Sequence, residues 1–286
     1  MIERFEAGVL PAKAEWQSHI SALKSRTVPA GKEAVRDALL AAVRERIPKG
    51  KFGLMLSGGL DSSLLAFLLK KEGADFVAVS VGIRGSPDVE SAGRLAKELE
   101  LSWAVRECTD EEVAQLAKEV SKMIPQKDIV NLSVGAVELA AARLGKEHGV
   151  SLFFGGLGSE EIFAGYKEHI VAKDINEACW AGMMDRLHDR DLTRDAALGS
   201  ALGISVRCPF LDDKVIVSAM GIPASEKYRD GQKKFVLREI AEGLGLPKEW
   251  AWRKRLAAQY GSGFDKALER IAKKKGVQKG VIAQRM

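Results

Sequence analysis

Cysteine is scarce in this chain of 286 residues, and its scarcity argues against two classes of protein. The cysteines are Cys108, Cys179 and Cys208, and they stand far apart. They therefore offer neither a disulfide framework nor a C-x-x-C pair for metal or redox chemistry. The four histidines show no metal-ligand spacing either. We expect no structural zinc site.

Long apolar runs are also missing. A membrane-spanning helix needs roughly 18 or more nearly charge-free residues, and every apolar stretch here is interrupted sooner. The N-terminus, MIERFEAGVL, has acidic residues where a secretory signal has an uninterrupted apolar run. We therefore expect a cytoplasmic protein without membrane contact.

The charge balance shows only a small excess of one sign. Lys and Arg number 44 against 39 for Asp and Glu, a formal net charge of +5. Such an excess can attract nucleotides or RNA, but a tight basic run such as Lys273–Lys275 is only three residues long. Nucleic acid is therefore not the expected partner. With 46% hydrophobic residues, the chain can bury a large core without disulfides.

Apolar runs alternate with segments of helical periodicity along most of the chain. Strand-like runs occupy residues 52–56, 76–81, 101–105 and 150–154, and helical patterns occupy residues 31–46, 64–69, 89–99, 111–123 and 133–148. This alternation predicts an α/β fold with a parallel twisted sheet and helices on both faces. Beyond about residue 174 we expect helices and loops without clear strands. The chain then divides into a helical lead-in, residues 1–49, and a main domain, residues 50–286, with a helical C-terminal portion.

The segment LSGGLDSS, residues 56–63, follows the first strand and opens a helix. Gly58 and Gly59 allow a tight turn and a close approach to a ligand, while a helix N-terminus attracts anions. The hydroxyls of Ser57 and Ser62 suit phosphate oxygens. Asp61 would repel a bare phosphate, so its presence points to Mg²⁺ bridging to the phosphates.

This octet resembles the PP-loop of the ATP pyrophosphatases, which cleave ATP between the α and β phosphates. More specifically, the chain resembles the synthetase domain of asparagine synthetase. The resemblance continues in VGIRGSPD at 81–88, GSEEIFAGY at 158–166, RCPFLD at 207–212 and KFVLR at 234–238, which occur in family order.

The resemblance implies an ATP-dependent, amide-forming ligase. In this family a carboxylate attacks the α-phosphate of ATP, and ammonia or another amine then displaces AMP. It implies a pyrophosphate site at Ser57, Gly58, Gly59, Asp61 and Ser62, adenine contacts at Met55 and Val81, and a further nucleotide contact at Gly156. It also implies Mg²⁺ ligands at Asp61 and Glu160, and catalytic cations at Lys234 and Arg255. Arg207 and Arg238 have either a structural or a functional role, and Lys254 flanks the site. The segment 257–263 resembles a loop that closes over the ligand.

Three features depart from the family pattern. Ile2 is the second residue, so the N-terminal cysteine nucleophile of the family's glutaminase is not matched, and we expect free ammonia or a separate glutaminase partner. Leu157 replaces the glutamate that helps the incoming amine, a group whose acid–base action is typically worth about 10²–10⁴-fold. Arg255 stands where the family has a lysine. Arginine retains the positive charge of lysine but not its titratable amine.

Two alternatives to the ligase remain open. A PP-loop RNA-modifying enzyme is compatible with the positive charge, although C-x-x-C pairs are absent. A nucleotide-binding regulatory subunit is compatible with Leu157 and Arg255. The sequence is also compatible with a homodimer.

Overall fold

The computed structural model describes residues 1–254 and 256–279. The strands are β1 (Phe52–Met55), β2 (Phe76–Ile83), β3 (Trp103–Cys108), β4 (Leu152–Phe154), β5 (Ser205–Arg207), β6 (Tyr228–Arg229) and β7 (Gln232–Lys233). The helices up to the end of β4 are α1 (Ile2–Glu6), α2 (Lys13–Ser25), α3 (Lys32–Arg46), α4 (Leu60–Lys71), α5 (Pro87–Glu98), α6 (Asp110–Met123) and α7 (Ile129–Glu147). The later helices are α8 (Ser159–Ile162), α9 (Lys167–Val171), α10 (Ile175–Ala181), the π-helix η1 (Gly182–Leu192), α11 (Thr193–Leu202), the 3-10 helix η2 (Pro209–Leu211), α12 (Asp213–Met220), α13 (Ala224–Lys227), α14 (Phe235–Leu244), α15 (Lys248–Ala251), α16 (Ala258–Gly261) and α17 (Phe264–Lys274).

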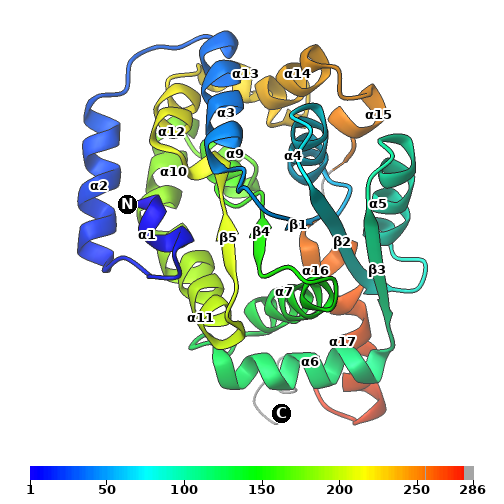
Figure 1. Ribbon diagram of the computed structural model, residues 1–286. Coiled ribbons are helices and arrows are strands. Elements are labelled where there is room, and N and C mark those ends of the chain that lie inside the picture. The colour runs from blue at the N-terminus through cyan, green and yellow to red at the C-terminus, as the bar shows by residue number, and fades with distance from the viewer. Residues whose placement is uncertain (255, 280–286) are drawn as a thin grey trace.

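The central sheet is parallel and has the strand order β3-β2-β1-β4-β5 (Figure 1). From β1 the chain moves outward through β2 to β3, then returns to place β4 on the other side of β1. The strand order therefore reverses between β1 and β4. Ligands of such sheets bind at this reversal, beyond the carboxyl ends of the strands. The fold predicts a site where β1 runs into the phosphate loop and β4 runs into Gly155.

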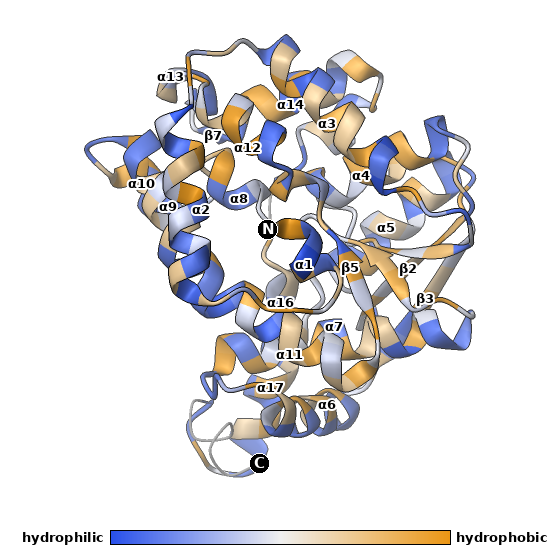
Figure 2. Ribbon diagram, turned by 60° about the vertical axis from the view of Figure 1, so that its left-hand side comes forward, coloured by the Kyte–Doolittle hydropathy of each residue, from blue (hydrophilic) through white to orange (hydrophobic). Residues whose placement is uncertain are grey.

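The two faces of the sheet are covered by different helices. Along β2, Val77 and Val79 point to the core shared with α6, α7 and α17, whereas Phe76 and Ala78 point to the core shared with α3, α4 and α5. This alternation follows from the two-residue repeat of a strand. Figure 2 shows the apolar colouring of β2 and the mixed colouring of the outer helices, as expected for a buried sheet between amphipathic helices. The predicted α/β fold is confirmed.

The predicted element boundaries differ from the observed ones where caps decide them. The α7 pattern was expected to start at residue 133, but the helix begins at Ile129. The side chain of Asp128 accepts hydrogen bonds from the backbone N–H groups of Val130 at 3.1 Å and Asn131 at 3.0 Å, which fixes an earlier start.

The prediction of no clear strand beyond residue 174 is wrong. Residues Ser205–Arg207 form β5, which pairs with β4 in the register Phe153 to Val206. Residues 228–233 form the antiparallel pair β6 and β7. Segments of two or three residues are too short to show alternation, so only their pairing identifies them.

The first 49 residues pack onto the rest of the chain. Trp16 of α2 is buried and donates its indole N–H to the carbonyl of Met183 at 2.7 Å. Glu6 of α1 accepts from Arg46 at 2.8 Å and from the backbone N–H of Cys208 at 2.7 Å. A boundary at residue 49 stays a prediction. Within residues 1–254 and 256–279, no helix combines the length and apolar character that a membrane crossing requires.

Candidate active site

The phosphate loop between β1 and α4 is held by its own serine hydroxyls. Ser57 Oγ and Ser62 Oγ lie 3.1 Å apart, and the backbone N–H of Ser57 donates to Ser62 Oγ at 3.2 Å. The backbone N–H of Gly59 donates to Ser57 Oγ at 3.3 Å. Gly59, Asp61 and Ser62 line a cavity of about 320 Å³ at the start of this twelve-residue helix. The N-terminal dipole end of α4 therefore faces the space where an anion would sit.

Gly58 does not line the cavity; it packs against α5 on the other side of the loop. It has φ +66°, and an added Cβ would lie 2.5 Å from Ser91 Oγ and 2.8 Å from the backbone nitrogen of Ala92 on α5. Its carbonyl accepts a hydrogen bond from Ser91 Oγ at 3.2 Å. A side chain at this position would push the loop away from α5, so glycine is required by both conformation and space.

Lys234 joins the two predicted metal ligands. Its ammonium nitrogen lies 2.7 Å from Asp61 Oδ2, 2.5 Å from Glu160 Oε1 and 2.9 Å from Ser159 Oγ. The lysine side chain is only 3% exposed, and the two carboxylates are 23% and 13% exposed. The structure thus brings together residues that are 173 positions apart at most. One buried cation holds two acids side by side.

The acid pair has the donor chemistry that a magnesium ion needs. Asp61 Oδ1 is buried and accepts no hydrogen bond from any residue among 1–254 and 256–279. A buried carboxylate oxygen without a donor is costly unless a cation or a ligand satisfies it. Gly156 lies directly against Asp61, since an added Cβ there would be 2.9 Å from Asp61 Cβ. Carboxylate oxygens are the ligands that Mg²⁺ prefers, so these residues fit the ion.

Two strained backbone positions shape this acid pair. Ala164 and Lys234 have φ values of 55°, a region that non-glycine residues rarely adopt. Gly165 directly follows Ala164, and an added Cβ at Gly165 would lie 2.7 Å from Lys234 Cε. Such strain persists where the surrounding structure determines it, and it gathers at functional sites.

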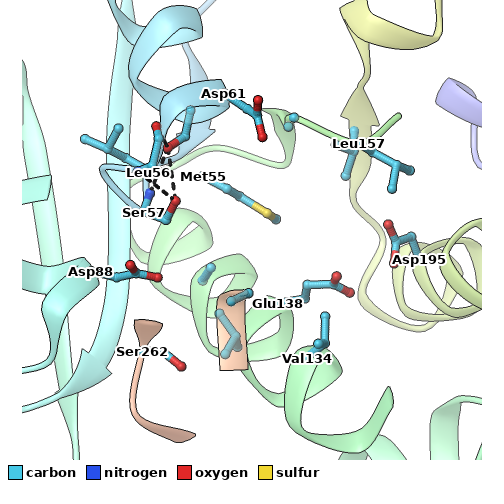
Figure 3. Close-up of a pocket in the computed structure, with 18 of the residues that line it drawn as sticks. Met55, Leu56, Ser57, Asp61, Asp88, Val134, Glu138, Leu157, Asp195 and Ser262 are labelled. Atoms are coloured by element: carbon cyan, nitrogen blue, oxygen red, sulfur yellow. Dashed lines mark hydrogen bonds between the residues drawn. The ribbon is translucent and has the colours of Figure 1, made fainter. Parts of the chain in front are cut away.

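The end of the cavity where the resemblance predicts the nucleotide, which we call the nucleotide end, has an apolar wall and one buried acid. Met55 and Val81 line it, together with Asp88 and Ser262 (Figure 3). Asp88 is 6% exposed, and burial raises its pKa to about 7 despite the opposing charge of Arg253. An apolar wall of this kind suits a base ring.

Arg253 ties the phosphate loop to α5, a role that the sequence analysis missed. Its guanidinium donates to the carbonyl of Gly58 at 2.8 Å and to the carbonyl of Pro87 at 2.9 Å, and lies 3.7 Å from Asp88. Lys254 is exposed. The predicted catalytic cation Arg255 lies outside the described residues. Arginine at 253 could not be found from a motif, because it acts on backbone carbonyls.

Arg207 and Arg238 both make contacts that support the fold, and Arg238 also lines the cavity. Arg207 lies 3.3 Å from Glu6 of α1, as expected for a residue that holds a carboxylate away from the cavity. Arg238 donates to the carbonyls of Lys233 at 2.8 Å and Ala251 at 2.8 Å. It therefore fixes the segment that carries Lys234 against the segment that carries Arg253.

The predicted closing loop at 257–263 is partly helical. Residues Ala258–Gly261 form α16, and the carbonyl of Ser262 accepts from the backbone N–H of Ile83 at 2.9 Å. Gln259 is buried. The predicted closing loop thus contains a short helix and is attached to the end of β2. Its closing over a ligand stays a prediction.

The other end of the cavity, which we call the inner end, is built by two helices and Leu157. One face of α7 supplies Val134, Val137, Glu138 and Ala141, and one face of α11 supplies Arg194, Asp195, Leu198 and Leu202. Figure 3 shows Leu157 and Asp195 on one side of the cavity and Met55, Ser57 and Asp88 on the opposite side. None of the inner-end residues except Leu157 was singled out from the sequence, because only tertiary packing brings α7 and α11 together.

The predicted site residues converge on this single cavity. Its lining includes Met55, Ser57, Gly59, Asp61, Ser62, Val81, Gly156, Glu160 and Lys234. Gly58 supports the loop, and Arg255 is outside the described residues. The roles assigned to these residues stay predictions, whereas their convergence is a structural finding.

Comparison with known proteins places the chain among relatives. Residues 34–182 and 168–281 match the family model described as "Asparagine synthase". A protein of Methanocaldococcus jannaschii, provisionally named asparagine synthetase [glutamine-hydrolyzing] 1, is 30% identical over 90% of this chain and 54% of its own length. Asparagine synthetase B [glutamine-hydrolyzing] of Escherichia coli K12 is 29% identical over 82% of this chain and 45% of its own length. The chain thus spans about half the length of the curated relatives it matches.

A solved structure of NMN synthetase from Francisella tularensis also matches. It is 16% identical and covers 86% of this chain and 95% of its own, with a TM-score of 0.34. That degree of superposition is too low to add to the fold or the site described above.

Proposed function

The chain belongs to the asparagine synthase family, and from that premise we propose that it is an ATP-dependent ligase that forms an amide with release of AMP and pyrophosphate. The donor is a carboxylate, aspartate or a related acid, and the acceptor is ammonia or an amine. We propose Mg²⁺ as the cofactor. The ammonia, where ammonia is used, comes from solution or from a separate glutaminase.

One observation carries this proposal: a phosphate-type loop, two facing acids and a buried lysine meet in one cavity. The N–H groups at the start of α4 are oriented to bind the β and γ phosphates. Asp61 and Glu160 would hold Mg²⁺, which neutralises negative charge on the leaving pyrophosphate. Lys234, already desolvated, would contribute a fixed positive charge at the same place.

The proposed reaction has two steps. A carboxylate oxygen attacks the α-phosphorus of ATP, the bond to the bridging oxygen of pyrophosphate breaks, and an acyl-adenylate remains. The unprotonated amine nitrogen then attacks the acyl carbon, AMP leaves with the carboxylate oxygen, and the nitrogen loses one proton to give the neutral amide. The bond changes of the first step need only the part of the cavity lined by Gly59, Asp61 and Ser62, which we call the phosphate end. The second step also needs room beside it for an amine.

Two assays test the proposal. The first follows exchange of labelled pyrophosphate into ATP, which reports adenylation alone, with aspartate and with a pool of other carboxylates. The second follows AMP formation after ammonium or an amine is added. Asp61→Ala should reduce exchange by at least about 10²-fold, because it removes a ligand of the ion that stabilises the leaving group. Glu147→Gln, an exposed change on α7, is the matched control.

The outcomes separate the alternatives. AMP that depends on aspartate and ammonium would support asparagine formation despite Leu157. Exchange with another carboxylate would keep the ligase and change its donor. ATP binding without exchange under any condition would contradict the ligase and favour the nucleotide-binding subunit, for which Leu157 is the supporting observation. Exchange or AMP formation only with tRNA would favour the RNA-modifying enzyme.

A further inference from the structure

The inner end of the cavity is lined mainly by hydrocarbon. On α7, Val134, Val137 and Ala141 are spaced three and four residues apart, so they share one face of the helix, and all three line the cavity. On α11, Leu198 and Leu202 are four residues apart and also line it. Each helix therefore presents an apolar stripe to the same space.

The sheet supplies a further apolar side. Ile204 and Val206 both line the cavity, and as residues two apart at β5 they point to the same face. An added Cβ at Gly155, at the end of β4, would lie 3.1 Å from Val206 Cγ1, so glycine lets this valine approach the loop that carries Leu157. We call Leu157 and these apolar residues of α7, α11 and β5 the inner wall.

Several members of the inner wall keep part of their surface accessible. Val134, Val137, Leu157, Leu202 and Ile204 are each only half-buried, although they line the cavity. Covering such surface with hydrocarbon is favourable because it removes the surface from water. The inner wall therefore favours a ligand group that is itself apolar.

The charged side chains beside the inner wall have partners within the protein. Arg194 Nη2 lies 3.0 Å from Glu138 Oε1 and 2.6 Å from Asp195 Oδ1, and Nη1 lies 2.9 Å from Asp191 Oδ1. Burial raises the pKa of Asp195, against the lowering effect of Arg194. These groups thus tie α7 to α11 and do not call for a charged ligand.

Leu157 connects the inner wall to the phosphate end. It directly follows Gly156, where an added Cβ would lie 2.9 Å from Asp61 Cβ. Figure 3 shows Leu157 and Val134 on opposite sides of the inner end. A substrate whose reactive group lies at the phosphate end can therefore extend its remaining atoms past Leu157 and along the inner wall.

We propose that the carboxylate donor carries an uncharged aliphatic chain, with its carboxylate at the phosphate end and its chain packed against the inner wall. This rests on the proposed ligase function and names the substrate class of its first step. A carboxylate oxygen bonds to the α-phosphorus of ATP while the bond from that phosphorus to the bridging oxygen breaks, and pyrophosphate leaves with the electron pair. The chain takes no part in these bond changes and serves to hold the donor.

The donor suits the inner wall better than the acceptor does. Its acyl group stays in the cavity through both steps, whereas the acceptor enters only after the acyl-adenylate has formed. A chain that covers the inner wall throughout also keeps water from that space, which protects a reactive adenylate from hydrolysis.

The test begins with the wild-type chain. Pyrophosphate exchange is measured at saturating magnesium and ATP with acetate, butyrate, hexanoate, succinate and aspartate. We expect kcat/KM for hexanoate to exceed that for acetate by at least about 10-fold, since each buried CH₂ strengthens binding by about fourfold. It should also exceed the values for succinate and aspartate, whose second charged group would lose water against hydrocarbon. Aspartate or succinate as the best donor, or equal values for acetate and hexanoate, would overturn the inference and leave the ligase intact.

Variants then test the inner wall. Val134→Phe should lower the ratio of kcat/KM for hexanoate to that for acetate by at least about 10-fold, because the larger ring takes the space of the chain. Val137→Thr keeps the shape but adds a hydroxyl that the chain would cover, so the ratio should fall at least about threefold. Val130→Phe, on the same helix at a 40% exposed position outside the cavity lining, is the matched control and should leave the ratio unchanged. Thermal melts check that each variant is folded.

Three other results would count against the inference. An unchanged ratio in both folded variants would show that the inner wall does not hold the donor chain. A chain-length preference among alkylamines in the AMP assay, with all carboxylates equal in exchange, would assign the inner wall to the acceptor. Absence of exchange with every carboxylate is a different failure, since it would contradict the ligase and this inference with it.

Discussion

The two ends of the cavity are built on different principles. The phosphate end is made by loops that leave the carboxyl ends of β1 and β4, by the start of α4 and by a lysine fixed at the start of α14. The inner end is made by side chains on the faces of α7 and α11. Backbone groups and a few fixed charges suffice for phosphate, which every substrate pair of such a ligase shares. Side chains on helices can be exchanged without disturbing the loop, so under the proposed function we expect substrate selectivity to depend on the inner end.

Removing the cation of the phosphate end should give the largest effect. Lys234→Met leaves Asp61 and Glu160 close together without their shared cation. We expect pyrophosphate exchange to fall by at least about 10²-fold and the free energy of unfolding to fall by about 3 kcal/mol. The exchange assay measures the first effect, and urea unfolding measures the second.

The matched control for this variant is another buried lysine. Lys227 is fully buried, lies 3.5 Å from Met220 Sδ, and forms no ion pair with any residue of the described ranges. Burial lowers its pKa to about 8. Lys227→Met should leave exchange unchanged and should not reduce stability. A loss of exchange equal to that of Lys234→Met would mean that any buried lysine is needed for folding, and the special role of Lys234 would be refuted.

Removing the cation of the inner end sharpens the comparison. Arg194→Met leaves Glu138 and Asp195 without an arginine partner among the described residues, while Asp191 keeps Arg190, so the free energy of unfolding should fall by about 3 kcal/mol. Exchange, measured at a temperature where the variant is folded, should fall much less than in Lys234→Met. A fall in exchange equal to that of Lys234→Met would mean that both ends of the cavity contribute equally to the adenylation step.

A smaller effect is expected where the phosphate loop is braced from outside. Arg253→Gln removes the hydrogen bonds to Gly58 and Pro87, so the loop should bind nucleotide less well. We expect the KM for ATP to rise about 10-fold, equal to roughly the 1–3 kcal/mol lost when buried carbonyls lose their donor. Lys254→Gln, at the exposed neighbouring position, should change it less than about twofold. The two variants exchange their ranking if Lys254 turns inward when ATP binds.

The smallest effect concerns stability against pH at the nucleotide end. The pKa of Asp88 is about 7 in the folded chain, against an ordinary value of 3.8. Between these values the folded state holds a proton that the unfolded state has released, so the contribution of Asp88 to stability falls as pH rises from about 4 through about 7. Asp88→Asn should therefore be more stable than wild type at pH 8 by about 1 kcal/mol or more, with little difference at pH 4. Urea unfolding at both pH values measures this, and a constant difference would contradict the buried, protonated state.

The sequence predicted those parts of the molecule that are determined by short sequence patterns and motifs. The runs at 52–56 and 76–81 became β1 and β2, and Asp61, Glu160 and Lys234 meet as the resemblance implied. Arg253 was missed because it binds backbone carbonyls. Every residue has one, so the sequence does not indicate which of them an arginine will contact. Glu138 and Asp195 were missed because each looks like a charged residue on a solvated helix face until α7 and α11 are packed together.

Lys234 has a consequence for the order in which ligands arrive. Its ammonium already pairs with both Asp61 and Glu160, so a divalent ion that comes alone meets a pair of acids with a partner in place. A triphosphate offers the lysine new anionic partners and so frees the acids for the ion. Nucleotide and magnesium should therefore enter as one unit: magnesium alone should leave the melting temperature unchanged, and ATP should raise it only when magnesium accompanies it.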